Sequence, residues 1–149
     1  MKRFLAILAV LSAACTSGPP APAALDTRNE SCGWCRMAIS EARFAGQIVA
    51  PSEEPRFFDD IGCLAHYVAG SKALPRGAIV YVADHRTRDW VRADAALYMR
   101  IDSLATPMGS HLIAHADAAS RDADPVARGG MSRTPAEVFS TGSVPGGGR

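Results

Sequence analysis

The sequence predicts a small α+β domain in which short strands outnumber helices. Apolar runs of a few residues, separated by polar turns, recur through most of the chain and are typical of short strands. Residues 60–69 instead carry apolar side chains at spacings of three and four, which is typical of one helix face. The chain has 149 residues and is 48% hydrophobic, so its size fits one domain or two small halves that share a core.

The first part of the predicted domain contains three strands and a helix. The strands are expected at residues 37–39, 44–50 and 56–58, with polar turns between them. Asp59 is expected to cap the helix over residues 60–69, and Gly70 to stop it. The apolar face of this helix is formed by Ile61, Leu64, Ala65 and Val68.

The second part carries a similar order of signals. Strands are expected at residues 77–83, 90–91, 95–101, 111–117 and 138–139. A short helix is expected within residues 117–128, where Pro125 limits its length. His111, Ile113 and His115 would share one face of their strand, because side chains alternate along a strand.

The N-terminal segment predicts export and membrane attachment. Lys2 and Arg3 precede an apolar run over residues 4–11, which is too short to cross a bilayer and is typical of a secretory signal. Small residues then lead to Cys15, so residues 1–14 resemble a lipoprotein signal peptide and Cys15 the lipidated residue. The alternative is ordinary cleavage that leaves Cys15 free. Thr16, by resemblance to lipoproteins of Gram-negative bacteria, favours the outer membrane and a periplasmic domain.

The remaining composition sets the domain boundaries and excludes several function classes. Residues 15–29 are rich in Pro and Ala and predict a flexible tether, residues 30–140 the folded domain, and residues 141–149 a disordered tail. The net charge is +1 with both signs scattered, so no nucleic-acid partner is expected. The chain has no P-loop, GxGxxG, GxSxG or HExxH motif.

The segment CGWCRM combines two thiols with a thioether. Cys35 and Met37 are two positions apart, so on a strand both side chains would point the same way. A thiolate and a thioether are soft donors that select Cu(I) over hard cations. Alternatives remain: Cys32 and Cys35 could form a structural disulfide or a thiol-exchange pair, and Met37 could be core.

Two further segments contain possible metal donors. In TPMGSH, Met108 lies between Pro and Gly, and His111 could add a nitrogen, although a loop Met and a strand His often have no such role. In FFDDIGCLAH, Cys63 lies in the first turn of the expected helix, where the dipole favours a thiolate. Cys63 and His66 could bind zinc, but a Cys in an apolar helix is more often a small buried hydrophobe.

Taken together, these motifs resemble the NosL family of copper-binding lipoproteins. The resemblance rests on the lipoprotein-like start and on CGWCRM, FFDDIGCLAHYV and TPMGS in this order, and it covers about residues 30–140. It implies a fold of two similar ββαβ halves related to the organomercurial lyase MerB, and a role in delivering copper to nitrous oxide reductase. It also implies Cys35, Met37 and Met108 as ligands. Relatives usually carry a small residue where this chain has Arg36, and many lack His111.

The sequence therefore predicts a membrane-anchored periplasmic carrier of one Cu(I) ion, not an enzyme. Cys35 and Met37 would bind the ion, with Met108 and Cys32 as the leading further donors and His111 behind them. The expected partner is a copper-accepting protein or the assembly machinery of nitrous oxide reductase. The rivals are a thiol–disulfide oxidoreductase using Cys32 and Cys35, a MerB-like enzyme that cleaves carbon–metal bonds, and a metal-free adaptor held by a disulfide.

Overall fold

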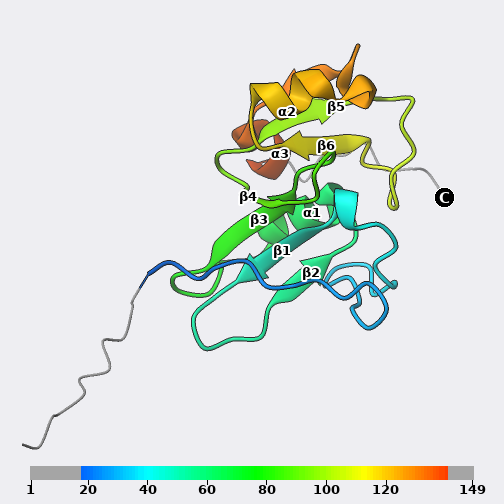
Figure 1. The fold of residues 1–149 in the computed structure, drawn as a ribbon. Coiled ribbons are helices and arrows are strands. Elements are labelled where there is room, and N and C mark those ends of the chain that lie inside the picture. Colours follow the sequence, from blue (N-terminus) through cyan, green and yellow to red (C-terminus); the bar gives the residue numbers. More distant parts are fainter. Residues whose placement is uncertain (1–17, 141–149) are drawn as a thin grey trace, which may run out of the picture.

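The computed structural model describes residues 18–140, which form two antiparallel sheets stacked along the molecule (Figure 1). The first sheet has the order β2-β1-β3-β4 and the second β6-β5-β7. The strands are β1 (Gly46–Val49), β2 (Arg56–Phe58), β3 (Ile79–Ala83), β4 (Trp90–Arg92), β5 (Leu97–Arg100), β6 (Leu112–His115) and β7 (Met131–Arg133). The predicted signal peptide, Cys15 and the predicted tail lie outside the described residues.

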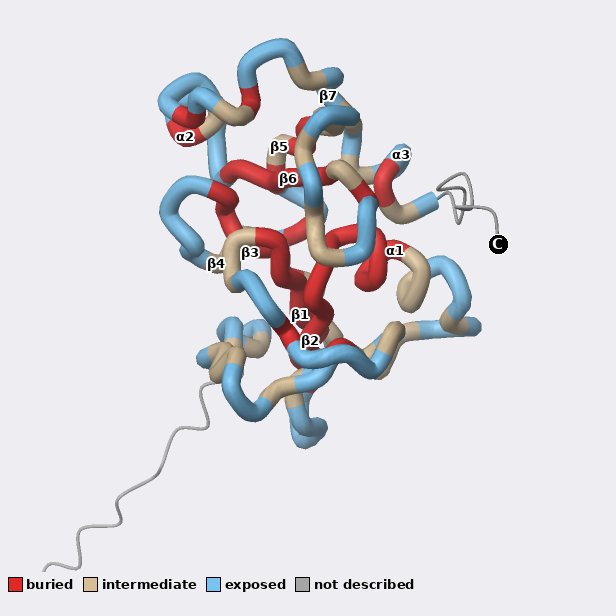
Figure 2. Tube along the Cα trace, turned by 90° about the vertical axis from the view of Figure 1, so that its right-hand side faces the viewer, coloured by how far each residue is buried: buried red, intermediate tan, exposed pale blue. Residues whose placement is uncertain are grey.

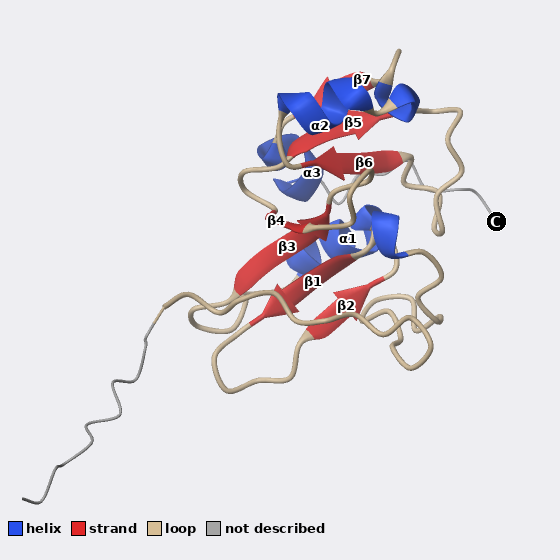
Figure 3. Cartoon of the chain, in the orientation of Figure 1, coloured by secondary structure: helices blue, strands red, loops and turns tan. Residues whose placement is uncertain are grey.

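Within residues 18–140, three α-helices and two 3-10 turns accompany the sheets (Figure 3). The helices are α1 (Ile61–Gly70), α2 (Ala118–Ala123) and α3 (Pro135–Ser140), and the 3-10 turns are η1 (Ala42–Phe44) and η2 (Pro125–Ala127). In the described part of the chain, no helix is long and apolar enough to span a bilayer.

The chain order repeats, and this confirms an α+β fold with two ββαβ halves. The first half runs β1-β2-α1-β3 with β1 in the centre of its sheet, and the second runs β5-β6-α2-β7 with β5 in the centre. In both halves the strand after the helix pairs with the free edge of the first strand, while β4 extends only the first sheet.

One hydrophobic core joins the two halves. Leu64 of α1, Val82 of β3 and Tyr98 of β5 are fully buried in the same cluster, together with Ala114 of β6. Figure 2 shows this buried region running from β1 and β3 through α1 to β6. The halves also meet through backbone pairing, because Asp84 forms a parallel bridge with Ala114.

Part of the predicted tether lies against the first sheet. The fully buried Gln47 side chain accepts a hydrogen bond from the Ala23 amide at 2.8 Å and donates one to the Ala23 carbonyl at 3.1 Å. The Tyr81 hydroxyl donates to the Pro20 carbonyl at 2.7 Å, and Leu25 packs on a small cluster around Phe57. The described portion of this segment is therefore held by β1 and β3.

Several expected elements differ from the structure. Residues 37–39 are not a strand, because only Ala38 pairs, in an isolated bridge with Ser31. Phe44 ends a 3-10 turn and does not begin a strand. His111 has a φ of 60°, so it stands outside β6 and cannot share a strand face with Ile113.

Two further differences concern the starts of helices α1 and α3. Asp60, not Asp59, caps α1, because Asp60 is extended and accepts from the Gly62 amide, while Asp59 accepts from the Ser40 amide at 2.7 Å. The expected strand at 138–139 is part of α3. Thr134 and Glu137 form a reciprocal capping box at the start of this helix, with Glu137 accepting from the Thr134 amide at 2.6 Å.

Candidate metal centre

Three cysteines from two parts of the first half meet at one point. Cys32 and Cys35 lie in the loop before β1, and Cys63 lies in the first turn of α1. Their sulfur atoms all lie within 4.8 Å of one another, and all three thiols are free. Cys32 and Cys63 are buried, whereas Cys35 is half-buried. The cluster is therefore a sulfur site with one face toward the surface.

The CGWCRM loop is closed by its own backbone. The Cys32 amide donates to the Met37 carbonyl at 2.8 Å, and the Arg36 amide donates to the Cys32 carbonyl at 3.0 Å. Arg36 adopts a left-handed φ of 67° to make this turn. The loop is a tight turn, so the expected strand, with Cys35 and Met37 on one face, is wrong.

A glycine lets this loop approach the sheet. A Cβ at Gly33 would lie 2.7 Å from Arg56 Cγ and 3.1 Å from the buried Phe58 ring. The Gly33 amide donates to the Phe57 carbonyl at 2.8 Å, which fixes the loop on β2. Since α1 follows β2 directly, this contact places Cys32 beside the start of α1.

Cys32 and Cys63 share a hydrogen bond that makes their pKa values differ. The Cys63 thiol donates a hydrogen bond to Cys32 Sγ, and this contact is the main reason that the pKa of Cys32 falls to about 4. Burial opposes the fall, but the backbone amides of Trp34, Cys35 and Asp59 also favour the Cys32 thiolate. Donating its proton raises the pKa of Cys63 far above the usual range. Burial is the main cause that raises the pKa of Cys35.

The loop that carries Met108 is attached to the same end of α1. The fully buried Asp60 carboxylate accepts from the Gly62 amide with Oδ1 and from the Met108 amide with Oδ2, at 2.6 and 3.1 Å. A Cβ at Gly62 would lie 2.7 Å from Ser110 Cβ, so the TPMGS loop packs closely on the helix. Asp60 thus connects this loop to the helix turn that carries Cys63.

Both candidate thioethers lie at the surface. Met37 is 58% exposed and Met108 is 44% exposed. Neither side chain is a core filler, which was the alternative for Met37. Both methionines are attached near the cysteine cluster through their backbones, Met37 by its carbonyl and Met108 by its amide.

The two histidine candidates have other contacts. His111 Nδ1 lies 2.7 Å from the Leu104 carbonyl, so this nitrogen is engaged by the backbone. His66 stacks on the exposed Trp34 ring, with 5.6 Å between ring centroids and 13° between planes. The described residues that gather around Cys63 as possible ligands are two cysteines, and His66 is not among them.

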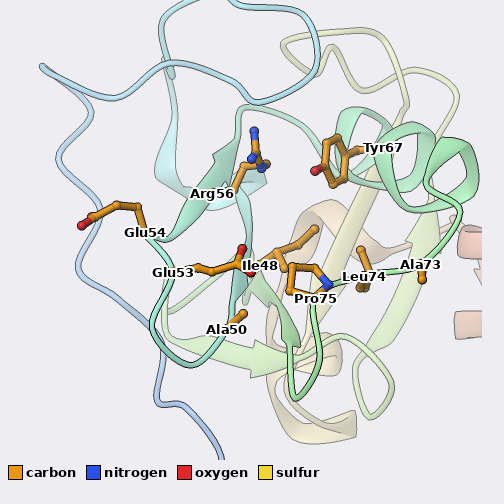
Figure 4. A pocket seen from close by; sticks show the side chains of 9 residues that line it. All are labelled: Ile48, Ala50, Glu53, Glu54, Arg56, Tyr67, Ala73, Leu74 and Pro75. Carbon is orange, nitrogen blue, oxygen red and sulfur yellow. The ribbon is translucent and has the colours of Figure 1, made fainter.

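A hollow on the first half is lined by none of the three cysteines (Figure 4). It encloses about 300 Å³, and its wall includes the Arg56 guanidinium, which stands 5.2 Å from the centre of the Tyr67 ring. Glu53 and Glu54 also line it. No Cys, His or Met lines this hollow, so it offers no soft donors for a metal ion.

Sequence reasoning found Cys32 and Cys35 but ranked Cys63 as a buried hydrophobe. The structure brings Cys63 to the same point as the other two thiols. The available signal was the position of Cys63 in the first turn of a helix that directly follows β2. What the sequence lacked was the packing of the CGWCRM loop on that strand.

The comparisons with known proteins give one match. A family model described as NosL matches residues 22–139. No curated protein and no solved structure matches the chain.

Proposed function

The chain belongs to the NosL family, and from this premise we propose that it is a carrier of one Cu(I) ion and not an enzyme. The observation that carries the proposal is the cluster of three free thiols within 4.8 Å of one another. Sulfur donors select soft monovalent copper over hard cations, because the sulfur atoms and the Cu(I) ion are both polarisable.

The proposed ligand set extends the set predicted from the sequence. Cys35 is the most accessible thiol of the cluster, and Cys32 contributes a buried thiolate behind it. We add Cys63, whose proton would leave when the ion binds. Met37 and Met108 are the candidate thioether donors from the surface side, since both are exposed and both are attached to the elements that hold the thiols.

This arrangement suits transfer better than storage. Exposed thioethers and a half-buried Cys35 leave one side of the proposed site open to an incoming ligand. A partner sulfur could then bind before the original ligands leave. We propose that the acceptor is a copper-dependent protein or its assembly machinery, with nitrous oxide reductase as the client, and that the chain is anchored through Cys15 to the periplasmic face of the outer membrane.

The burial of Cys32 favours the carrier over the oxidoreductase. In thiol exchange the low-pKa thiolate must reach the disulfide of another protein. Here the thiolate is on Cys32, which is fully buried, while the accessible Cys35 has a raised pKa. A substrate disulfide would therefore meet the less reactive thiol.

The test is an anaerobic titration of the reduced protein with Cu(I) against a competing chelator. We expect one Cu(I) per chain, with affinity reduced at least tenfold in Cys35→Ser and in Cys63→Ser. Met37→Leu and Met108→Leu should weaken binding less than the cysteine variants. Met131 is the matched control, because it is 47% exposed on the edge strand β7 of the other sheet, and Met131→Leu should leave the affinity unchanged.

Two results would contradict the proposal. One is a reduced protein that does not retain copper in the presence of the chelator. The other is an affinity that stays the same in all the cysteine variants while their unfolding curves match the unaltered protein. A loss in Cys35→Ser without a loss in Cys63→Ser would reject only our addition of Cys63.

A further inference from the structure

A second cluster of possible metal ligands lies between the two halves and contains no sulfur. His85 follows β3, His115 ends β6, and Asp124 lies between α2 and η2. One ligand atom from each lies within 4.8 Å of the others, and each residue is at most 5% exposed. In Figure 1, β6 lies between α2 and β3, so the fold brings these three positions together.

One carboxylate oxygen of this cluster faces two imidazole rings. Asp124 Oδ2 lies 2.6 Å from His85 Nδ1 and 3.0 Å from His115 Nε2. The other oxygen, Oδ1, accepts from the Val126 amide at 2.9 Å. That backbone contact fixes the carboxylate plane, as the outer contacts of a metal-binding carboxylate do.

Among the described residues, the His115 side chain is hydrogen-bonded through one ring nitrogen only. His115 Nδ1 is buried and has no hydrogen-bond partner among the described residues. The buried ring is therefore positioned in the cluster through Nε2, the nitrogen that faces Asp124 Oδ2.

We propose that His85, His115 and Asp124 form a second metal site, which takes a divalent first-row ion such as Zn²⁺. Two imidazole nitrogens and a carboxylate oxygen are a borderline donor set that Zn²⁺ prefers and Cu(I) does not. The ion would occupy the position of the two protons that now lie between the nitrogens and Oδ2. Each ring keeps one proton, which moves to its other nitrogen, so binding needs no other reactant.

The distances allow this exchange with a small movement. Ligand atoms around tetrahedral zinc are roughly 3.3 Å apart, because each zinc–ligand bond is about 2.0–2.1 Å. The two nitrogen–oxygen pairs at 2.6 and 3.0 Å would open by less than about 1 Å to meet this value. Since Asp124 stands between two short helical segments, its position can adjust without shifting a strand.

The place of the cluster gives the site a structural consequence. His85 belongs to the first half and its amide donates to the Ala114 carbonyl of the second at 2.8 Å, while His115 and Asp124 belong to the second half. An ion bound by all three would therefore link the two halves. We expect bound Zn²⁺ to stabilise the whole fold, because it would bind only when the halves are docked.

The test uses Co²⁺ as the probe, because cobalt bound to thiolates shows an intense sulfur-to-metal absorption band that nitrogen and oxygen ligands do not give. The reduced protein, equilibrated with excess Co²⁺, should bind one equivalent without that band, in addition to any cobalt on the cysteines. Asp124→Asn and His115→Gln should each lose this equivalent. Asp122→Asn, an exposed carboxylate two positions away, should keep it, as should His66→Gln.

The variants must be shown to be folded. If Asp124→Asn does not unfold cooperatively, His115→Gln or His85→Gln carries the same comparison. Added Zn²⁺ should raise the unfolding temperature of Cys32→Ser/Cys35→Ser/Cys63→Ser protein by several degrees, and of the same protein with His115→Gln not at all. Two results would overturn the proposal. One is that all cobalt bound to the reduced protein shows the thiolate band. The other is that the equivalent without this band persists in folded Asp124→Asn or His115→Gln protein. Both readouts are independent of Cu(I) binding.

Discussion

The Asp60 carboxylate performs two tasks, and Asp60→Asn separates them. In the native protein Oδ1 caps α1 through the Gly62 amide, and Oδ2 accepts from the Met108 amide. An asparagine has only one acceptor oxygen, and its NH₂ group cannot accept from an amide. The side chain can keep the cap or keep the Met108 loop, but one amide donor loses its partner in either orientation.

The expected cost follows from that lost bond. A hydrogen bond to a charged group contributes about 1.5–3 kcal/mol when buried, and the Met108 amide is only partly buried, so we expect about 1–2 kcal/mol. This is roughly a 5- to 30-fold change in the folding equilibrium. With a slope of about 2 kcal/mol per molar urea, the midpoint should fall by about 0.5–1 M.

The assay is urea unfolding of the reduced protein, with Asp117→Asn as the matched control. Asp117 also caps a helix, α2, but accepts only from the Ser120 amide, so an asparagine there can keep its bond. The control should change the midpoint little. In the copper titration, Asp60→Asn should weaken binding about as much as Met108→Leu. Equal midpoints for Asp60→Asn and the unaltered protein would show that the carboxylate does not hold the loop.

Three further predictions concern the fold around the site. Gly46→Ala should destabilise the protein by about 1–3 kcal/mol in urea unfolding, since its Cβ would lie 2.5 Å from Leu64 Cδ2, an overpacked contact between β1 and α1. Gln47→Met should release Ala23 from the sheet and speed amide exchange and proteolysis there, because both hydrogen bonds to Ala23 disappear. Tyr98 should stay protonated in the folded protein at a pH where a tyrosine of the unfolded chain ionises, because burial raises its pKa. An absorbance titration of the folded and the unfolded protein would detect the difference.

The pH dependence that follows from Tyr98 has a definite sign. Its folded pKa lies above the value of about 10 in the unfolded chain, so its stabilising contribution is complete below pH 10 and is lost as the pH rises further. Tyr98→Phe should remove this alkaline decline and also the hydrogen bond to the Ala93 carbonyl at 2.8 Å.

Failures of these predictions would be specific. Gly18→Ala is the control for Gly46→Ala, since nothing lies within 4 Å of its Cβ position. If Gly46→Ala were as stable as this control, α1 could shift away from β1. An unchanged exchange rate at Ala23 in Gln47→Met would mean that apolar packing alone holds the segment. A Tyr98 that ionises at the same pH in the folded and in the unfolded protein would contradict its burial.

Local sequence signals predicted most of the elements and most of the candidate donors. Residues 60–69 read as a helix because their apolar side chains fall on one face, and β2 and β3 read as strands because they are short apolar runs between turns. The strand expected at 138–139 was wrong because two apolar residues outweighed the Thr134–Glu137 capping box. β7 was missed because it is short and largely exposed, so it has no apolar pattern.

The sequence by itself determined which chemistry is available to this protein: soft sulfur donors in two loops and in one helix turn. Only the tertiary structure decided which of those donors meet. Cys63 joins Cys32 because Gly33 lets the loop pack on β2, and His85 meets His115 because β3 and β6 come together between the halves. Contacts between residues that are 30 or more positions apart depend on the packing of whole elements, and local periodicity does not record that packing.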